Sequence, residues 1–328
     1  MKKKILFVTS SRAEYGIIKN VINIFNKDKY FINYILITGS HLESKFGNTY
    51  KEITNNNNQL FKIKLFNKKL DHEGVIQNIS KGLIKYKNFI QKIKPDLIFL
   101  LGDRYEILSV SLAANFLLIP VAHIHGGEIS LGSFDNATRN TISQFSKLHF
   151  TATSQSKKRL ENFGINKKNI FHVGSPSLSS IKIKNLLKKS QLEKNLKINF
   201  SKINIICTYH PETISKINEK KNITTIIKAF KKFKNCNVFF TGINPDPKSQ
   251  SIYDVINLEV KKNKNFYYFK SLGNFNYLSL VNCSQLVIGN SSSGLIEVPF
   301  LKKYSINLGI RQKGREKPIS VIDCEINQ

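Results

Sequence analysis

The sequence has few cysteines, few acidic residues and no long apolar run. Its four cysteines in 328 residues lie far apart and form no CxxC pair, which argues against a disulfide framework and favours reduced, partly buried thiols. No apolar run approaches the roughly 20 residues of a membrane span. The apolar start, Ile5 to Val8, is too short for the core of a signal peptide. We therefore expect a cytoplasmic protein that does not associate with a membrane.

The shortage of acidic residues produces a net charge of +29, from 51 Lys+Arg against 22 Asp+Glu. Such a charge fits three explanations: nucleic-acid binding, an anionic substrate, or a biased composition. The lysines are scattered in small groups among abundant Asn and Ile, which favours biased composition on solvated surfaces. No zinc-finger spacing and no RNA-binding aromatic signature is present, so we expect no nucleic-acid partner. An anionic small molecule remains consistent with the charge.

Regular alternation of short apolar runs and helical segments predicts an α/β protein with doubly wound parallel sheets. A chain of this length suits two domains. The alternation is interrupted by a Lys-, Ser- and Leu-rich connection, Ser177 to Lys202, and restarts at Ile203. We predict an N-terminal α/β domain over 1–177 and a second over 178–328, with a ligand cleft between them.

Two acidic residues directly follow neighbouring predicted strands. Leu97 to Leu101 stops at Gly102-Asp103, and Val121 to His125 is broken by Gly126-Gly127 before Glu128. Two strands joined by one helix should lie parallel through a right-handed crossover. Asp103 and Glu128 then lie on the edge of the sheet where open α/β sheets bind ligands.

Asp135 and Arg139 extend this group. Asp135 is a good N-cap for a helix that runs to about Lys147, and Arg139 lies one turn further on the same side. Arg12, in the strand-to-helix turn SSRAEY, is placed to meet an anion, although that turn lacks the GxGxxG fingerprint. The alternative is that the carboxylates cap helices or are solvated loop charges, and that Arg12 is a surface charge.

His123 and His125 alternate on one face of their predicted strand. Together with Asp103 and Glu128 they could form a metal site that activates water. No HExxH motif and no second His/Asp cluster supports that reading, so we expect no metal. We expect instead that one of the histidines orients a carboxylate by hydrogen bonding.

The second half contains two candidate phosphate-binding elements. Gly289-Asn290-Ser291-Ser292-Ser293-Gly294 lies between a strand and a predicted helix from about Ser293, where small residues, the Ser291 and Ser292 hydroxyls and a helix N-terminus favour anions. An ordinary serine cap is the alternative. Glu297 could accept hydrogen bonds from sugar hydroxyls. His210 follows the strand Ile203 to Thr208, where it could donate to a phosphate or move protons, or be purely structural.

The ordered set SRAEYG, GDRYE, HIHGGE, the Asp135–Arg139 pair, YHPET and GNSSSGLIEVP resembles the UDP-N-acetylglucosamine 2-epimerases, in particular their hydrolysing branch in sialic-acid-type sugar biosynthesis. The resemblance covers nearly the whole chain. It implies a GT-B fold of two Rossmann-like domains that bind a nucleotide sugar. It also implies no metal, no nicotinamide cofactor and a homo-oligomer, either a dimer or a tetramer.

The resemblance further implies a role for each matching residue. Catalytic roles fall to Asp103, Glu128, Asp135 and His210, with His210 beside the diphosphate; substrate contacts fall to Arg12, Arg139, Ser291, Ser292 and Glu297. The implied reaction removes the C2 proton, expels UDP to leave a glycal, and adds water at C1 with protonation of C2 from the opposite face. Such chemistry needs an acid and a base with different proton affinities.

Two departures from the family pattern affect these expectations. Asn140 follows Arg139 where the hydrolysing branch typically has His, and the sequence stops at Gln328 where relatives usually continue with helices that pack on the first domain. We therefore keep two alternatives: a non-hydrolysing 2-epimerase, and a nucleotide-sugar-binding protein with weak catalysis.

Overall fold

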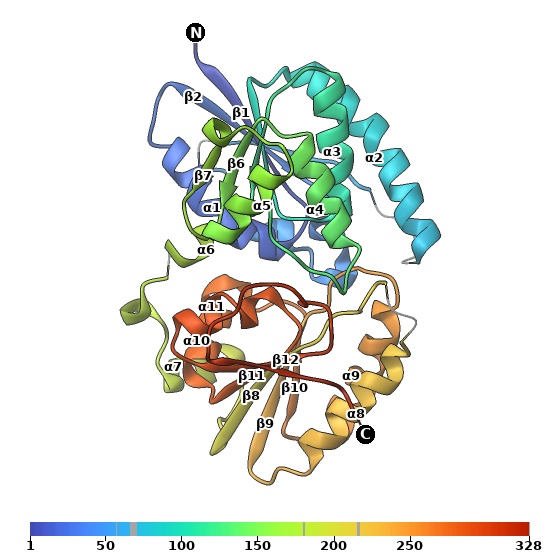
Figure 1. Cartoon of the computed structure of the whole chain (residues 1–328). Coiled ribbons are helices and arrows are strands. Elements are labelled where there is room, and N and C mark those ends of the chain that lie inside the picture. Colours follow the sequence, from blue (N-terminus) through green and yellow to red (C-terminus); the bar gives the residue numbers. More distant parts are fainter. Residues whose placement is uncertain (57, 66–70, 180, 215–216, 328) are drawn as a thin grey trace. The chain divides into compact units, whose positions relative to one another are not determined.

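The computed structural model describes residues 1–56, 58–65, 71–179, 181–214 and 217–327. The chain forms two compact units, coloured mainly blue to green and yellow to red in Figure 1. The first comprises Met1–Glu128 and Phe134–Ser180, and the second comprises Ile129–Ser133 and Ile181–Gln328. The five residues Ile129–Ser133 therefore pack with the second unit although the sequence on both sides belongs to the first.

In the described part of the first unit, seven parallel strands form one sheet in the order β3-β2-β1-β4-β5-β6-β7. The strands are β1 Lys3–Thr9, β2 Phe31–Ile37, β3 Gln59–Lys62, β4 Leu97–Leu101, β5 Val121–Ile124, β6 Leu148–Thr151 and β7 Ile170–His172. The helices are α1 Arg12–Phe25, α2 His72–Ile93, α3 Tyr105–Phe116, α4 Asp135–Gln144, α5 Ser154–Asn162 and α6 Pro176–Ser179. Short 3₁₀ helices occupy Gly39–Leu42, Ser44–Phe46, Thr49–Glu52 and Lys167–Asn169.

Alternating side chains of the central strands bury two layers of core. Leu6 and Val8 of β1 pack with residues of α2 and α3 on one face, and Ile5 and Phe7 pack with α1 on the other. Figure 1 shows α2 and α3 side by side on the face of the sheet that they cover. Strands buried on both faces read as continuous apolar runs, which is why their positions are visible in the sequence.

The described part of the second unit repeats the plan with six parallel strands in the order β10-β9-β8-β11-β12-β13. These are β8 Ile203–Thr208, β9 Cys236–Thr241, β10 Phe266–Phe269, β11 Leu286–Gly289, β12 Tyr304–Leu308 and β13 Val321–Cys324. The helices are α7 Lys189–Leu196, α8 Glu219–Lys231, α9 Ser249–Lys262, α10 Gly273–Cys283 and α11 Glu297–Phe300, with 3₁₀ turns at Ile183–Asn185 and Ser292–Gly294. Helices α8 and α9 cover one face of the sheet, and α10 and α11 cover the other.

Several expectations from the sequence concern the whole chain. Two doubly wound parallel sheets confirm the predicted fold class. All four cysteines are free, and Cys207 and Cys236 are buried. Over the described residues, no helix combines the length and apolar character needed to cross a membrane.

Candidate active site

In each sheet the strand order reverses direction at one point, and that point is the usual ligand crevice of an open α/β sheet. In the first unit the reversal lies between the adjacent strands β1 and β4. The turn after β1 carries Arg12, the first residue of α1, and the turn after β4 carries Asp103. The topology therefore brings two predicted site residues to one edge of the sheet.

Arg139 connects the residues that follow β4 and β5. Its Nη2 forms an ion pair with the Asp103 carboxylate, and its Nη1 donates to the backbone oxygen of Glu128 at 2.8 Å. Arg139 is 2% exposed, whereas the Asp103 side chain is 23% exposed and so remains accessible. The predicted grouping of Asp103, Glu128 and Arg139 thus exists in the first unit.

Glu128 is held by a histidine, as the sequence led us to expect. His125 Nδ1 lies 2.6 Å from Glu128 Oε1, and its Nε2 lies 3.1 Å from the Ser175 hydroxyl. His125 follows the end of β5 and has a φ of +65°, an uncommon conformation for a residue with a side chain. This backbone conformation directs the His125 imidazole toward the Glu128 carboxylate, so that the two groups can share one proton in their hydrogen bond.

His123 has a structural role. Its Nε2 donates to the Gly102 backbone oxygen at 2.7 Å, and its Nδ1 lies 3.0 Å from the Ser143 hydroxyl. Burial lowers the pKa of His123 to about 3, so the ring is neutral. Both nitrogens of His123 and of His125 contact protein atoms, which leaves neither ring to bind a metal. No group of three potential metal ligands occurs among the residues that the structure describes.

Asp135 differs from its prediction. Phe134 is the N-cap of α4, and Asp135 is the first helical residue, so the expected cap is wrong. Asp135 is 2% exposed and lies one turn before Arg139 on the same helix. A carboxylate in the first turn is still favoured by the positive end of the helix dipole.

Three charged residues near the turn that carries Arg12 are buried: Glu14, Arg104 and Glu106. Glu14 accepts hydrogen bonds from the backbone N–H of Ser10 at 2.6 Å and of Ser11 at 3.2 Å, and so closes the turn that carries Arg12. Burial, together with the charge of Glu106, raises the pKa of Glu14 to about 7. Glu106 is fully buried and pairs with Arg104 through two hydrogen bonds of 3.0 and 3.2 Å. The sequence analysis did not single out these three residues, because only the fold brings Glu14, after β1, near Arg104 and Glu106, after β4.

In the second unit the reversal lies between β8 and β11, whose ends carry His210 and the serine loop, Asn290–Gly294. Asn290 ties the two together: its Oδ1 accepts from the His210 N–H at 2.7 Å and its Nδ2 donates to the His210 backbone oxygen at 2.8 Å. The Asn244 N–H donates to His210 Nδ1 at 3.2 Å. A neutral His210 therefore carries its proton on Nε2, as a phosphate donor requires.

The helix that we predicted from about Ser293 is not present as one continuous helix. Ser292–Gly294 is a 3₁₀ turn, and α11 covers only Glu297–Phe300, so an anion site built on a helix dipole is wrong here. The Ser291 hydroxyl instead accepts from the Ser293 N–H at 3.4 Å. Hydroxyls rather than a helix terminus are the donors that this loop offers. Glu297 is partly buried at the start of α11.

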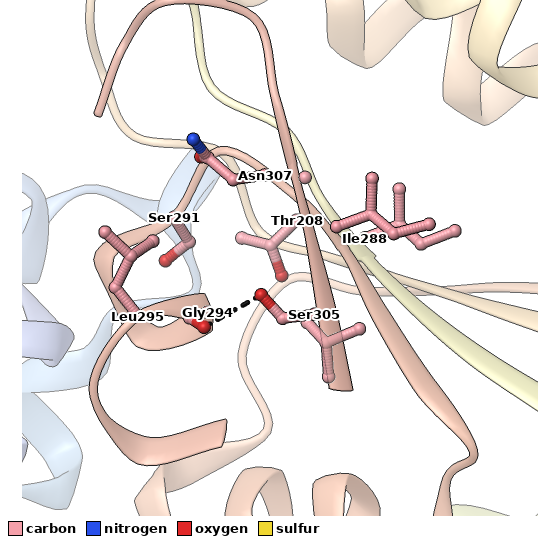
Figure 2. A pocket seen from close by; sticks show the side chains of 10 residues that line it. Thr208, Ile288, Ser291, Gly294, Leu295, Ser305 and Asn307 are labelled. Carbon is pink, nitrogen blue, oxygen red and sulfur yellow. Dashed lines mark hydrogen bonds between the residues drawn. The ribbon is translucent and has the colours of Figure 1, made fainter. Parts of the chain in front are cut away.

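A small pocket lies behind the serine loop, where Thr208, Ser291, Gly294, Ser305 and Asn307 contribute to its wall (Figure 2). Ser305 Oγ donates to the Gly294 backbone oxygen at 2.8 Å, the dashed line of Figure 2. Gly289 opens the loop with a φ of +143°, and a Cβ there would lie 1.9 Å from the Thr208 oxygen. Only glycine permits β11 to leave the sheet this close to β8.

The sequence analysis also missed a second support of the serine loop. Arg311 Nη1 and Gln312 Nε2 donate to the Asn290 backbone oxygen at 3.2 and 2.9 Å. The Ile310 N–H donates to Glu212 Oε1 at 2.7 Å, which joins this segment to the YHPET motif. The two glycines of this segment, Gly309 and Gly314, are the sequence signal that could have predicted a turn here. Both have a positive φ in the structure.

Comparison with known proteins identifies the family of this chain. The UDP-N-acetylglucosamine 2-epimerase family matches residues 23–328. The chain is 38% identical to the GDP/UDP-N,N'-diacetylbacillosamine 2-epimerase (hydrolyzing) of Campylobacter jejuni, over 99% of this chain and 85% of that protein. It is 37% identical to the polysialic acid biosynthesis protein P7 of Escherichia coli, over 99% and 83% of the two chains.

A solved structure shares the fold. The UDP-GlcNAc 2-epimerase of Neisseria meningitidis bound to UDP-GlcNAc superposes with a TM-score of 0.79 at 20% identity, covering 97% of this chain and 86% of that one. The two parallel-sheet units thus have a GT-B-like architecture. On the family match and on the identity over the whole chain, this protein belongs to the UDP-N-acetylglucosamine 2-epimerase family.

Proposed function

We propose that the protein is a hydrolysing nucleotide-sugar 2-epimerase. It converts UDP-N-acetylglucosamine, or a related nucleotide-linked acetamido sugar, to the free C2 epimer and UDP. The observation that carries this proposal is the assembly of Asp103, Glu128 and Arg139 at the reversal point of the first sheet, in a chain of the epimerase family. The "hydrolyzing" named for the Campylobacter jejuni relative supports the hydrolytic outcome.

The first step removes the proton from C2 of the sugar. Its electron pair forms the C1–C2 double bond while the bond from C1 to the UDP oxygen breaks. Asp103 is suited to act as the base, because the Arg139 guanidinium favours its ionised form and its side chain remains partly exposed. UDP leaves with the bonding electrons, and the sugar becomes a glycal.

The second step adds water across this double bond. The water oxygen bonds to C1 and releases one of its protons to solvent, while the electron pair of the double bond takes up a proton at C2 from the face opposite to the one that lost it. The Glu128–His125 pair is suited to supply that proton, because the 2.6 Å contact lets one proton pass between carboxylate and imidazole. Asp135 is the third carboxylate available, and we propose that it orients the water or the sugar.

The second unit holds the departing diphosphate. His210 presents its Nε2–H, and Ser291 and Ser292 present hydroxyls, so that charge developing on the leaving oxygen meets fixed donors. Arg12 adds a cation and Glu297 accepts from the ribose hydroxyls. The proposal requires that these groups and the carboxylates reach one bound substrate.

A product assay across UDP- and GDP-linked acetamido sugars tests this function. We expect release of the nucleoside diphosphate together with a free sugar inverted at C2. Release of UDP-N-acetylmannosamine as the final product would instead identify a non-hydrolysing epimerase. Nucleotide binding without release of the diphosphate from any of these sugars would contradict an active enzyme and favour a binding protein. The homo-oligomer and the cytoplasmic location expected from the sequence stay predictions.

A further inference from the structure

The segment Ile129–Ser133, here called the strap, connects two proposed catalytic residues. Glu128 precedes it directly, and Asp135 lies two residues beyond its end. Both carboxylates belong to the first unit, whereas the strap packs with the second. The backbone positions of Glu128 and Asp135 are therefore constrained by whatever holds the strap.

The strap is held by the turn Gly309–Arg315. The Leu131 N–H donates to the Lys313 backbone oxygen at 3.1 Å, and the Ser133 hydroxyl lies 3.2 Å from that of Thr213 in the YHPET motif. Gly132 lies against the backbone of Ile310: a Cβ at this position would lie 2.2 Å from the Ile310 oxygen and 2.6 Å from the Arg311 Cα. Gly132 does not have a positive φ, so close approach alone requires glycine here.

The same turn supports the proposed diphosphate site. Arg311 and Gln312 both donate to the Asn290 backbone oxygen, and Asn290 pairs with the backbone of His210. Glu212 accepts from the Ile310 N–H. One turn thus contacts the serine loop through its side chains and the strap through its backbone.

We propose that Gly132 is a positioning residue for the reaction. By letting the strap dock on the Gly309–Arg315 turn, it fixes the backbone that carries Glu128 and Asp135 and links it to the loop that binds the diphosphate. This inference rests on the proposed function for its effect on turnover. Its structural part, the link between nucleotide binding and the strap, does not require turnover.

The test combines kinetics with hydrogen exchange on Gly132→Ala. The added methyl group cannot coexist with the Ile310 oxygen, so the strap must leave the turn. We expect kcat to fall on the order of 10²-fold, the effect of a displacement of about 1 Å in a catalytic group. The Kd for UDP should rise only by the modest factor by which UDP protects the strap amides in the wild-type protein, because the two effects are reciprocal, and kcat should fall much further. A merely structural role would lower stability and UDP affinity together with kcat.

Hydrogen exchange follows the strap directly. In the wild-type protein, UDP should slow exchange of the backbone amides of the strap, including the Leu131 N–H. In Gly132→Ala, UDP should still bind but should no longer protect these amides. Lys313→Gln is the matched control, because this side chain is exposed and the backbone oxygen that accepts from the Leu131 N–H does not depend on it. It should behave as wild type in both measurements.

Each outcome decides between clear alternatives. A folded Gly132→Ala protein with wild-type kcat, or with strap amides still protected by UDP, would overturn the proposal. If this variant does not fold, Ser133→Ala decides, because it deletes the hydroxyl that contacts Thr213. It should lower kcat moderately and speed strap exchange, and unchanged kcat would overturn the proposal. A wild-type protein that binds UDP and protects the strap without turning over any sugar would refute the proposed function alone.

Discussion

The two units share one plan and differ in what they place at its reversal point. Both are parallel sheets in which the first strand of the unit adjoins the second and fourth. At the carboxyl ends of β4 and β5, beside that point, the first unit presents carboxylates, an imidazole and guanidinium groups, several of them buried and paired. The second presents hydroxyls, an amide and backbone groups around His210. The comparison leads us to propose that one topology supplies proton transfer in the first unit and most of the nucleotide contacts in the second.

The largest expected effect comes from removing the proposed base. Asp103→Asn should lower kcat about 10²- to 10⁴-fold, the usual contribution of acid–base catalysis. The Kd for UDP should stay near the wild-type value, because the proposed UDP contacts are Arg12 and residues of the second unit, not Asp103. Steady-state kinetics and calorimetric titration with UDP measure the two quantities.

Asp96→Asn is the matched control for this substitution. Asp96 immediately precedes β4, at the strand's opposite end from Asp103, and its ion pair with Lys3 is exposed. It should leave kcat unchanged. A parallel loss of UDP affinity in Asp103→Asn would contradict the division of labour between the units.

The next largest effect that we expect is a pH dependence of the free energy of unfolding caused by the buried Glu14. Its pKa of about 7 in the folded protein, raised mainly by burial, exceeds the value of 4.5 for a free side chain. A raised pKa means that the folded state binds the proton more tightly, so this stabilisation is complete below pH 4.5 and is lost as pH rises through 7. The loss is about 3 kcal/mol, from 1.36 kcal/mol per pKa unit.

Glu14→Gln should remove this dependence. Denaturant unfolding at pH 5 and pH 8 should show that wild type loses more stability than the variant over this range. Glu106 and Arg104, the charged neighbours of Glu14, remain in both proteins and so cancel in the difference. Equal pH dependence in the two proteins would show that Glu14 does not titrate as described.

A smaller effect should appear in the second unit. Ser291→Ala removes a proposed diphosphate donor, which should weaken UDP binding about tenfold if the hydrogen bond to a charged group contributes about 1.5 kcal/mol. Ser320→Ala, a substitution in the turn before β13, is the control and should bind UDP as wild type does. Unchanged UDP affinity in Ser291→Ala would remove this hydroxyl from the site.

The smallest effect tests the support of the serine loop. Ser305→Ala deletes the hydrogen bond to Gly294 drawn in Figure 2 and should lower the free energy of unfolding by about 1 kcal/mol. Thermal unfolding measures this loss. Turnover should be nearly normal, since Ser305 is buried behind the loop. A large loss of kcat would show that Ser305 takes part in the site itself.

Local sequence patterns explain which predictions succeeded. The strands Ile203–Thr208 and Phe266–Phe269 have the predicted bounds, because short apolar runs buried on both faces are distinct in sequence. The residues that follow strands, Asp103, Glu128 and His210, are located by the same patterns. The edge strand Val321–Cys324 was missed because it has only four residues and its apolar run is interrupted by Asp323.

Long-range contacts explain the failures. The cap of α4 shifted to Phe134, and the helix after the serine loop shortened to a 3₁₀ turn followed by four residues. The strap and the Gly309–Arg315 turn are far apart in sequence, and each lacks regular secondary structure that a pattern could reveal. Only the contacts of Leu131 and Gly132 with that turn show that the two segments pack together.

The central claim is that this chain exchanges the C2 proton of a nucleotide sugar while it expels the nucleotide. The most direct measurement is the reaction of the wild-type enzyme in D₂O, followed by NMR of the sugar product. We predict one deuterium at C2 of a free, C2-inverted sugar for each UDP released. A free sugar that retains its original hydrogen and configuration at C2 would contradict the account, because it would reveal simple hydrolysis of the nucleotide sugar.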